Sequence, residues 1–187
     1  MSEHVKVLYE DLDRVLISGE EIREAVLRMG EQITSEYQGK SPVMICILKG
    51  AVVFFSDLIR NIHLPVSLDF MAISSYGSAT LSTGVVRILK DLDKPIDGRH
   101  VILVEDIIDS GMSLAFLKQT LFARGAASMK VCVLLDKPER RRTHVDVDYR
   151  GFVIPDDFVV GYGLDYAELY RNLPVIGVLK PEIYTKD

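Results

Sequence analysis

The sequence predicts an α/β fold with a central, mostly parallel sheet flanked by helices. Short apolar runs alternate along the chain with segments of helical periodicity, which is the pattern of parallel βαβ units. The 187 residues are 48% hydrophobic and 26% charged, which is enough apolar surface for one core of ordinary size. We therefore expect a single domain over residues 1–187.

The first half of the chain contains a helix and then the first βαβ unit. Ser18 followed by Glu21 is typical of a capping box, and apolar residues at helical spacing through Ile33 predict an amphipathic helix of about four turns. The next elements are a buried strand, a helix and a second strand, expected at VMICIL (43–48), AVVFFSDLIR (51–60) and VSLDFMAI (66–73).

The second half contains the clearest βαβ unit. The run VILV (101–104) predicts a strand, leucines at helical spacing predict a helix over residues 113–124, and MKVCVLL (129–135) predicts the next strand. Shorter apolar runs separated by prolines predict further strands at FVI (152–154), FVV (158–160) and VIGVL (175–179).

Two polar segments match neither period. Residues 74–84 and 90–100 are rich in Ser, Thr, Gly and Asp, which is typical of loops. Long polar loops inside a compact domain often close over a binding site, so segment 74–84 is a candidate mobile loop. A loop with no such function is an equally good interpretation of its composition.

Three carboxylates, Glu105, Asp106 and Asp109, lie at the carboxyl end of the strand predicted at 101–104. Open α/β sheets bind ligands at such ends. Residues Ser110–Ser113 then begin a helix, whose free N–H groups and positive dipole end favour an anion such as phosphate. The carboxylates would repel that phosphate unless they faced sugar hydroxyls, Mg²⁺ or a proton to be removed, so the arrangement suits a sugar phosphate. An acidic turn that only stabilises the helix would need one carboxylate.

Charge and hydropathy disfavour other classes of protein. A net charge of −5 would repel a polyphosphate backbone, which argues against a nucleic-acid partner. No apolar run approaches the ~20 residues that cross a bilayer, and the acidic start of the chain differs from a secretory signal. Cys46 and Cys132 both lie in apolar runs, so we expect neither a disulfide nor a zinc site. We expect a cytoplasmic protein with no nucleic-acid or membrane partner.

Five segments of the chain together resemble a known family. VILVEDIIDSGMS (101–113) is similar to the phosphoribosyl pyrophosphate signature of type I phosphoribosyltransferases. Four more resemble hypoxanthine-guanine phosphoribosyltransferases of bacterial type: ILKGA (47–51), SSYG (74–77), LLDKPERR (134–141) and IPDDFVVGYGLDYAELYRNLP (154–174). The resemblance covers nearly the whole chain, and it implies a small hood, formed by terminal segments, beside the central sheet.

The resemblance implies roles for the residues that follow the strand at 101–104. Glu105 and Asp106 would engage the ribose hydroxyls and a Mg²⁺ ion, and Asp109 would be the general base or acid at purine N7. The 5′-phosphate would be held by the run Asp109, Ser110, Gly111, Met112 and Ser113.

Other segments would complete the phosphoribosyl pyrophosphate site. The Leu48–Lys49 peptide bond is typically cis in this family, and it would aim the amides of Lys49 and Gly50 at pyrophosphate. Arg171 would contact the same pyrophosphate. Ser75 and Tyr76 would lie on the loop that closes over the site and excludes water.

The resemblance also implies a purine site. Lys137 would donate to the 6-oxo group, Phe158 would stack on the ring, and Val159 would contact the base edge through its backbone. Asp165 would be a second Mg²⁺ ligand. Taken singly, Phe158 would be a core residue, Asp165 a turn cap and Lys137 a solvated surface charge.

The implied activity is transfer of the 5-phosphoribosyl group from phosphoribosyl pyrophosphate to hypoxanthine, guanine or both, with Mg²⁺ as cofactor, in a homodimer or homotetramer. One alternative is a regulator of the same fold that binds nucleic acid through Arg140–Arg142, and the net charge of −5 argues against it. Another is an enzyme for adenine or a pyrimidine, and the segments around Lys137 and Phe158 argue against that.

Overall fold

A six-stranded sheet forms the centre of the computed structural model, which describes residues 8–75 and 86–185. The strand order is β4-β3-β2-β5-β6-β7, and every neighbouring pair is parallel except β3 and β4. The strands are β2 (Val43–Leu48), β3 (Ser67–Ser75), β4 (Val86–Lys90), β5 (His100–Ile108), β6 (Ser128–Asp136) and β7 (Tyr149–Val153). The predicted mostly parallel sheet is confirmed.

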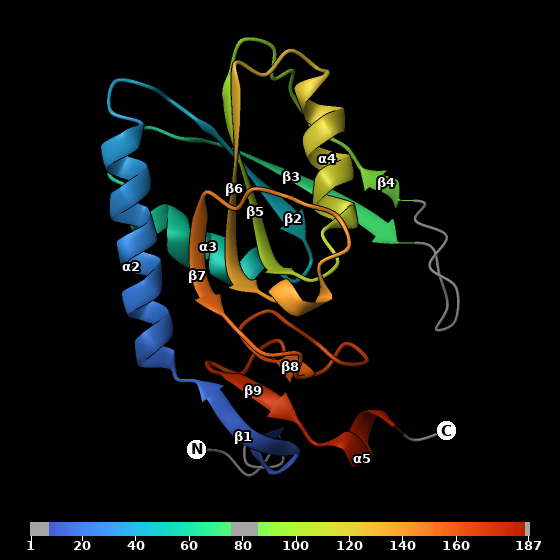
Figure 1. Ribbon diagram of the computed structural model, residues 1–187. Coiled ribbons are helices and arrows are strands. Elements are labelled where there is room, and N and C mark those ends of the chain that lie inside the picture. Colours follow the sequence, from blue (N-terminus) through green and yellow to red (C-terminus); the bar gives the residue numbers. More distant parts are fainter. Residues whose placement is uncertain (1–7, 76–85, 186–187) are drawn as a thin grey trace.

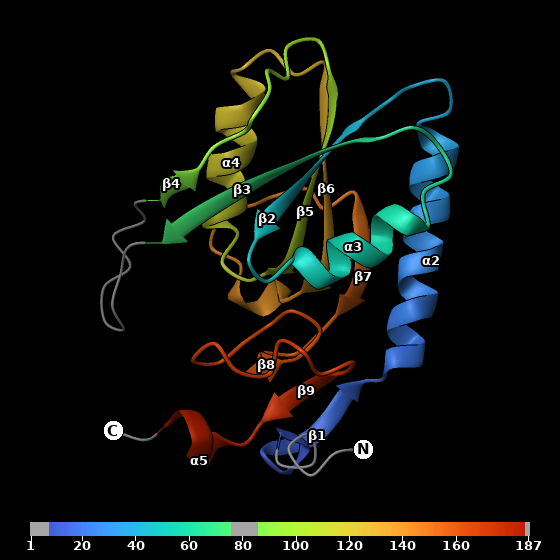
Figure 2. The same ribbon diagram turned by 180° about the vertical axis from the view of Figure 1, so that it is seen from behind.

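Helices cover both faces of this sheet (Figures 1 and 2). The helices are α2 (Gly19–Glu36), α3 (Val52–Arg60) and α4 (Met112–Phe122), with the short elements η1 (Pro138–Arg140) and α5 (Pro181–Tyr184). Side chains of a strand point alternately to its two faces, so Met44 and Cys46 pack with α2 and α3, while Ile45 and Ile47 pack with α4. Burial on both faces explains why the central strands are apolar without alternation.

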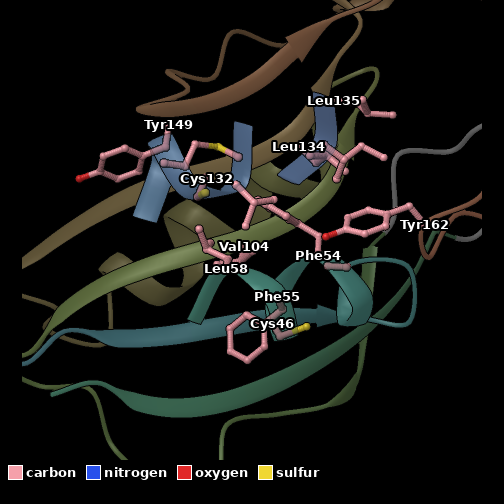
Figure 3. Packing of buried hydrophobic residues seen from close by; sticks show 14 of the residues in the cluster. Cys46, Phe54, Phe55, Leu58, Val104, Cys132, Leu134, Leu135, Tyr149 and Tyr162 are labelled. Atoms are coloured by element: carbon pink, nitrogen blue, oxygen red, sulfur yellow. The ribbon is translucent and has the colours of Figure 1, made fainter. Parts of the chain in front are cut away.

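The core beneath α3 is packed with aromatic, aliphatic and sulfur side chains (Figure 3). Phe54, Phe55 and Leu58 of α3 lie against Cys46 of β2 and its neighbours in the sheet. Both cysteines are free and fully buried, and burial raises the pKa of the Cys46 thiol to about 12. The two thiols are therefore core residues, as their apolar context predicts.

A second, smaller sheet forms the hood beyond the carboxyl ends of β5 and β6 (Figure 1). Its antiparallel strands β1 (Leu12–Ile17), β9 (Ile176–Leu179) and β8 (Val159–Val160) come from the two ends of the described chain. A small cluster of buried hydrophobic residues supports it: Leu12, Val160, Tyr170, Leu173 and Leu179. The hood implied by the resemblance is therefore present.

Local boundaries depart from the sequence in instructive ways. The capping box of Ser18 and Glu21 is present, with the Glu21 N–H 3.3 Å from Ser18 Oγ, and α2 continues to Glu36. Strand β5 extends to Ile108, so Glu105 and Asp106 lie within the strand, and the strand predicted at 101–104 was too short. Pairing with β6 through Ile108 and Asp136 explains the extension. No helix in the described ranges is long and apolar enough to cross a membrane.

Candidate active site

Two acidic residues lie enclosed at the carboxyl end of β5. Glu105 Oε2 is buried and has no hydrogen-bond partner among the described residues. Burial, and then the charge of Asp106, raise the pKa of the Glu105 carboxyl well above its ordinary value. Burial also raises the pKa of Asp106 to about 6, although its Oδ1 accepts a hydrogen bond from the Ile107 N–H at 3.0 Å. Two neighbouring buried carboxyls destabilise the fold when both are charged, and a bound cation would relieve their repulsion. They are therefore candidates for a cation site.

The turn after β2 packs directly on Asp106. The Leu48–Lys49 peptide bond is cis, as the resemblance implies. A Cβ atom on Gly50 would lie 1.8 Å from Asp106 Oδ2, and one on Gly163 would lie 2.1 Å from the Gly50 carbonyl oxygen. These close approaches require glycine at both positions. They bring the turn after β2, which we call the first loop, into contact with Asp106 of β5 and with the hood.

The segment Asp109–Ser113 forms the phosphate-type loop predicted from the sequence. Gly111 adopts a left-handed conformation with φ of +81° and begins α4, so the free N–H groups of that helix end lie beside this loop. The loop borders a cavity of about 620 Å³, which Asp109, Ser110, Met112 and Ser113 line together with residues of segment 139–142 and Asp156. A helix start that opens onto a cavity is suited to an anion.

Asp109 has one paired and one unpaired carboxylate oxygen. Its Oδ2 accepts from an Arg140 guanidinium nitrogen at 3.2 Å, while its Oδ1 is enclosed without a partner in the described part of the chain. Arg140 also pairs with Asp156 at 2.8 Å, and Arg141 pairs with Asp136. Arg140 and Arg141 are thus both engaged by carboxylates.

Lys137 lies beside this cavity, with its Nζ 3.8 Å from a carboxylate oxygen of Asp156, and Phe158 follows two residues after Asp156. Lys137 is only 7% exposed, and its Nζ donates to the Asp157 carbonyl oxygen at 2.6 Å. Burial lowers the pKa of the Lys137 ammonium, and the charges of Asp109 and Asp156 oppose that effect. Phe158 is 38% exposed, so the interpretation of this ring as a core residue is wrong. Val159, by contrast, is buried in β8 beside Val178.

The hood also supplies a network of charged groups. Arg171 binds Asp165 at 2.8 Å and donates to the Gly163 carbonyl oxygen at 2.8 Å, while its Nε is enclosed without a partner in the described chain. Asp165 Oδ2 accepts from the Glu168 N–H at 2.9 Å, so its role as a turn cap is confirmed. Glu168 in turn binds Lys49 Nζ at 3.1 Å. This network connects the first loop to the hood.

Sequence reasoning missed two neighbours of the site. The ring of Tyr184 stacks on Phe158, with centroids 4.7 Å apart and an interplanar angle of 19°. Glu168 lies between two cations that the resemblance assigns to pyrophosphate, Lys49 and Arg171. Neither has a sequence signal beyond residue type. Of the predicted closing loop, Ser75 ends β3, and Tyr76 lies outside the described residues.

Comparisons with known proteins agree with this geometry. Residues 18–167 match the family model described as "Phosphoribosyl transferase domain". The chain belongs to this phosphoribosyltransferase family. It is 51% identical to hypoxanthine-guanine phosphoribosyltransferase of Bacillus subtilis over 178 residues, which cover 95% of this chain and 99% of that protein.

Two further relatives add scale and context. A crystal structure of a hypoxanthine phosphoribosyltransferase from Staphylococcus aureus superposes with a TM-score of 0.93 at 48% identity, covering 96% of this chain and 98% of that one. The bifunctional protein TilS/HprT of Listeria monocytogenes strain F2365 is 49% identical over 179 residues. That match covers 96% of this chain but only 28% of the bifunctional protein, so this chain spans under a third of its length.

Proposed function

We propose that this chain is a purine-salvage transferase that moves the 5-phosphoribosyl group from phosphoribosyl pyrophosphate to hypoxanthine, guanine or both. The bond from ribose C1′ to pyrophosphate breaks and a bond from C1′ to the purine forms, which yields IMP or GMP and pyrophosphate. One observation carries the proposal: the phosphate-type loop lines a cavity together with Asp156, and the buried Lys137 lies beside that cavity, with its Nζ 3.8 Å from Asp156 and within reach of the charge of Asp109. The family match supports the same activity.

Lys137 and its neighbours select a 6-oxopurine in this proposal. An ammonium has three donors and no acceptor, and Lys137 uses one donor on the Asp157 carbonyl oxygen. The remaining donors suit the oxo group of hypoxanthine or guanine and do not suit the amino group of adenine. Phe158 would stack on the ring with Tyr184 behind it, and the backbone of Val159 would contact the base edge.

The phosphate-type loop and its neighbours would bind and activate the sugar phosphate. The N–H groups and hydroxyls of Ser110–Ser113 would hold the 5′-phosphate. Asp109 would act as general base or acid at purine N7. Its Oδ1 has no partner among the described residues, and its charge raises the pKa of Lys137, which is assigned to the purine, so the two side chains are near each other. Arg171, Lys49 and the Gly50 amide would contact pyrophosphate, and the enclosed Arg171 Nε is a donor available for it.

A magnesium ion fits the acidic end of β5. Glu105 Oε2 is enclosed without a partner in the described chain, and the charge of Asp165 adds to the raised pKa of Asp106. The described residues contain no group of three or more His, Cys, Asp or Glu that could hold a metal ion. Because Mg²⁺ usually keeps several waters and takes further oxygen ligands from substrate phosphates, the three carboxylates of this proposal would not have to enclose it by themselves. We assign Glu105, Asp106 and Asp165 to it, and the bound ion would neutralise charge on the leaving pyrophosphate.

We also propose that the chain acts as one domain in the cytoplasm, as a homodimer or homotetramer. The ion pairs from Lys49 to Glu168 and from Arg14 to Asp157 tie distant segments together and support the single domain. The resemblance implies the assembly and the location.

The proposal is tested by initial rates with hypoxanthine, guanine, adenine and a pyrimidine, each with phosphoribosyl pyrophosphate and Mg²⁺. We expect turnover of at least one 6-oxopurine and scarcely any of adenine. Lys137→Met should raise KM for hypoxanthine and lower the hypoxanthine-to-adenine efficiency ratio by about 10- to 100-fold. Lys90→Met is the matched control, because Lys90 also donates to backbone carbonyls, yet at the far edge of the sheet. Equal use of adenine by the wild type, or an unchanged ratio in Lys137→Met, would contradict the proposal.

A further inference from the structure

A segment after β6 lies along the backbone of the phosphate-type loop. The N–H groups of Arg142 and Thr143 donate to the Ser110 carbonyl oxygen at 2.9 and 3.1 Å. Arg141 Nε donates to the Asp109 carbonyl oxygen at 3.2 Å. A Cβ atom on Gly111 would lie 2.6 Å from the Thr143 carbonyl oxygen and 2.9 Å from Arg141 Cδ. The conformation of the loop thus depends on residues some thirty positions later in the chain.

The Arg141 side chain is itself held by a buried carboxylate. Asp136, the last residue of β6, is 3% exposed, and its two oxygens bind different arginines. One accepts from Arg141, and the other accepts from Arg150 Nε at 2.8 Å. The fork of a guanidinium can serve two acceptors at once, so Arg141 spans from Asp136 to the Asp109 carbonyl oxygen.

We propose that Arg141, oriented by Asp136, is a positioning residue for the phosphate-type loop, and that it presents the Ser110–Ser113 N–H groups to the 5′-phosphate. The inference rests on the proposed function, because it assigns the loop to a phosphoribosyl ligand. It adds that Arg141 and Asp136, which lie outside the loop in sequence, help to fix the loop's conformation. Asp136 does not line the cavity; Arg141 does, and in this scheme it acts through the loop backbone. Their effect is to fix the backbone from which the ligand is bound.

Arg150 separates this role from simple charge compensation. Both arginines neutralise Asp136, but the hydrogen bonds of the described residues connect only Arg141 to the loop, and the side chain of Arg150 is 45% exposed against 18% for Arg141. If Arg141 served only to neutralise Asp136, its loss and the loss of Arg150 would have similar consequences. If Arg141 positions the loop, only its loss should weaken binding of a phosphate group.

The test compares Arg141→Met with Arg150→Met in the full chain, using IMP and inosine as probes. For Arg141→Met we expect IMP to bind roughly tenfold more weakly, with inosine affinity unchanged, because one orienting hydrogen bond to the loop is lost. For Arg150→Met we expect the IMP-to-inosine affinity ratio to stay within about twofold of wild type. The near-isosteric Asp136→Asn should shift the ratio in the same direction as Arg141→Met, by less. Equal ratios in the two arginine variants would overturn the inference.

Hydrogen exchange of the ligand-free protein provides a second readout. The amides of residues 110–113 should exchange faster in Arg141→Met than in Arg150→Met, whatever ligand the protein binds. Failure of the wild type to bind IMP would therefore overturn the proposed function, while the exchange data would still decide the positioning role. Unchanged exchange in Arg141→Met would overturn that role even if IMP binds as expected.

Discussion

The central sheet and the hood contact each other where Gly163 approaches Gly50, but they are built in different ways. In the sheet, β2, β5 and β6 are buried on both faces by apolar contacts with three helices. The hood has a small apolar cluster of its own, other buried residues of its strands join the core beside α2 and α3, and polar contacts between distant segments supplement both. Tyr170, for example, donates its hydroxyl to Asp11 at 2.8 Å, and Arg14 binds Asp157 at 2.5 Å.

The two regions also differ in backbone conformation and in chemistry. Four described non-glycine residues have positive φ, and all four lie in the hood: Tyr162, Ala167, Glu168 and Tyr170. The carboxyl end of β5 carries the carboxylates assigned to the phosphoribosyl group, and the hood carries the aromatic ring assigned to the base. A robust sheet thus supports the groups expected to set the rate. A locally strained hood supports the groups expected to set substrate affinity.

The largest effect should come from Asp109, at the carboxyl end of β5. Replacing Asp109 by Asn removes the proposed general base while keeping the shape of the side chain, so we expect a rate loss of ~10²–10⁴-fold with IMP binding largely kept. Initial rates and IMP titration measure it. Asp146→Asn is the control, because Asp146 is an exposed carboxylate that pairs with His144 and does not line the cavity beside the phosphate-type loop. A near wild-type rate in Asp109→Asn would remove Asp109 from the chemistry.

The contact between the two regions is the next point to break. Gly163 has φ of +104°, and a Cβ there would lie 2.1 Å from the Gly50 carbonyl oxygen. We expect Gly163→Ala to lower the free energy of unfolding by about 2–4 kcal/mol, through both backbone strain and the clash. Gly39 has φ of +72° with nothing within 4 Å of a Cβ, so Gly39→Ala should cost only the strain of roughly 1 kcal/mol. Equal losses in urea denaturation would mean that the contact with Gly50 contributes nothing.

The buried carboxyl of Asp106, at the carboxyl end of β5, should also lower the stability of the ligand-free protein. The pKa of Asp106 is about 6 in the fold against an ordinary 3.8, so between these values the folded protein binds more protons than the unfolded chain. Stability from this group is therefore lost as pH rises through about 6. Asp106→Asn, without metal, should raise the free energy of unfolding by about 1–3 kcal/mol at pH 7.5 and by little at pH 4. A gain that is larger at pH 4 would contradict the sign of the effect.

The smallest effect should come from a single hydrogen bond within the hood. Tyr170→Phe removes the bond to Asp11, and Tyr149→Phe removes a similar bond to Glu36, of 2.5 Å, beside the sheet. Each should cost about 0.5–1.5 kcal/mol in thermal unfolding. Only Tyr170→Phe should also raise KM for hypoxanthine, by a few-fold, because it alone loosens the hood. A larger KM change in Tyr149→Phe would contradict the division of roles.

Much of the central sheet could be predicted from the sequence. Apolar runs and helical spacing correctly predicted β2, α3, β3, α4 and β6, because elements buried on one or both faces carry the periodicity of their own backbone. The acidic run ending at Asp109 and the helix start after it likewise predicted a ligand site at the end of β5, where the structure has the start of α4 and a cavity. Such signals lie within a few residues of each other, so a single sequence is enough to read them.

Only the tertiary structure decided the hood and the contacts between residues that are distant in the sequence. Strand β1 pairs with β9, with Leu12 opposite Leu179, and no local pattern specifies a partner so far along the chain. The approach of Gly163 to Gly50, the stacking of Tyr184 on Phe158 and the bridge from Asp136 through Arg141 to Asp109 are of the same kind. Periodicity records which face of an element is buried, whereas a contact between distant residues depends on how whole elements pack, and that is settled only when the chain has folded.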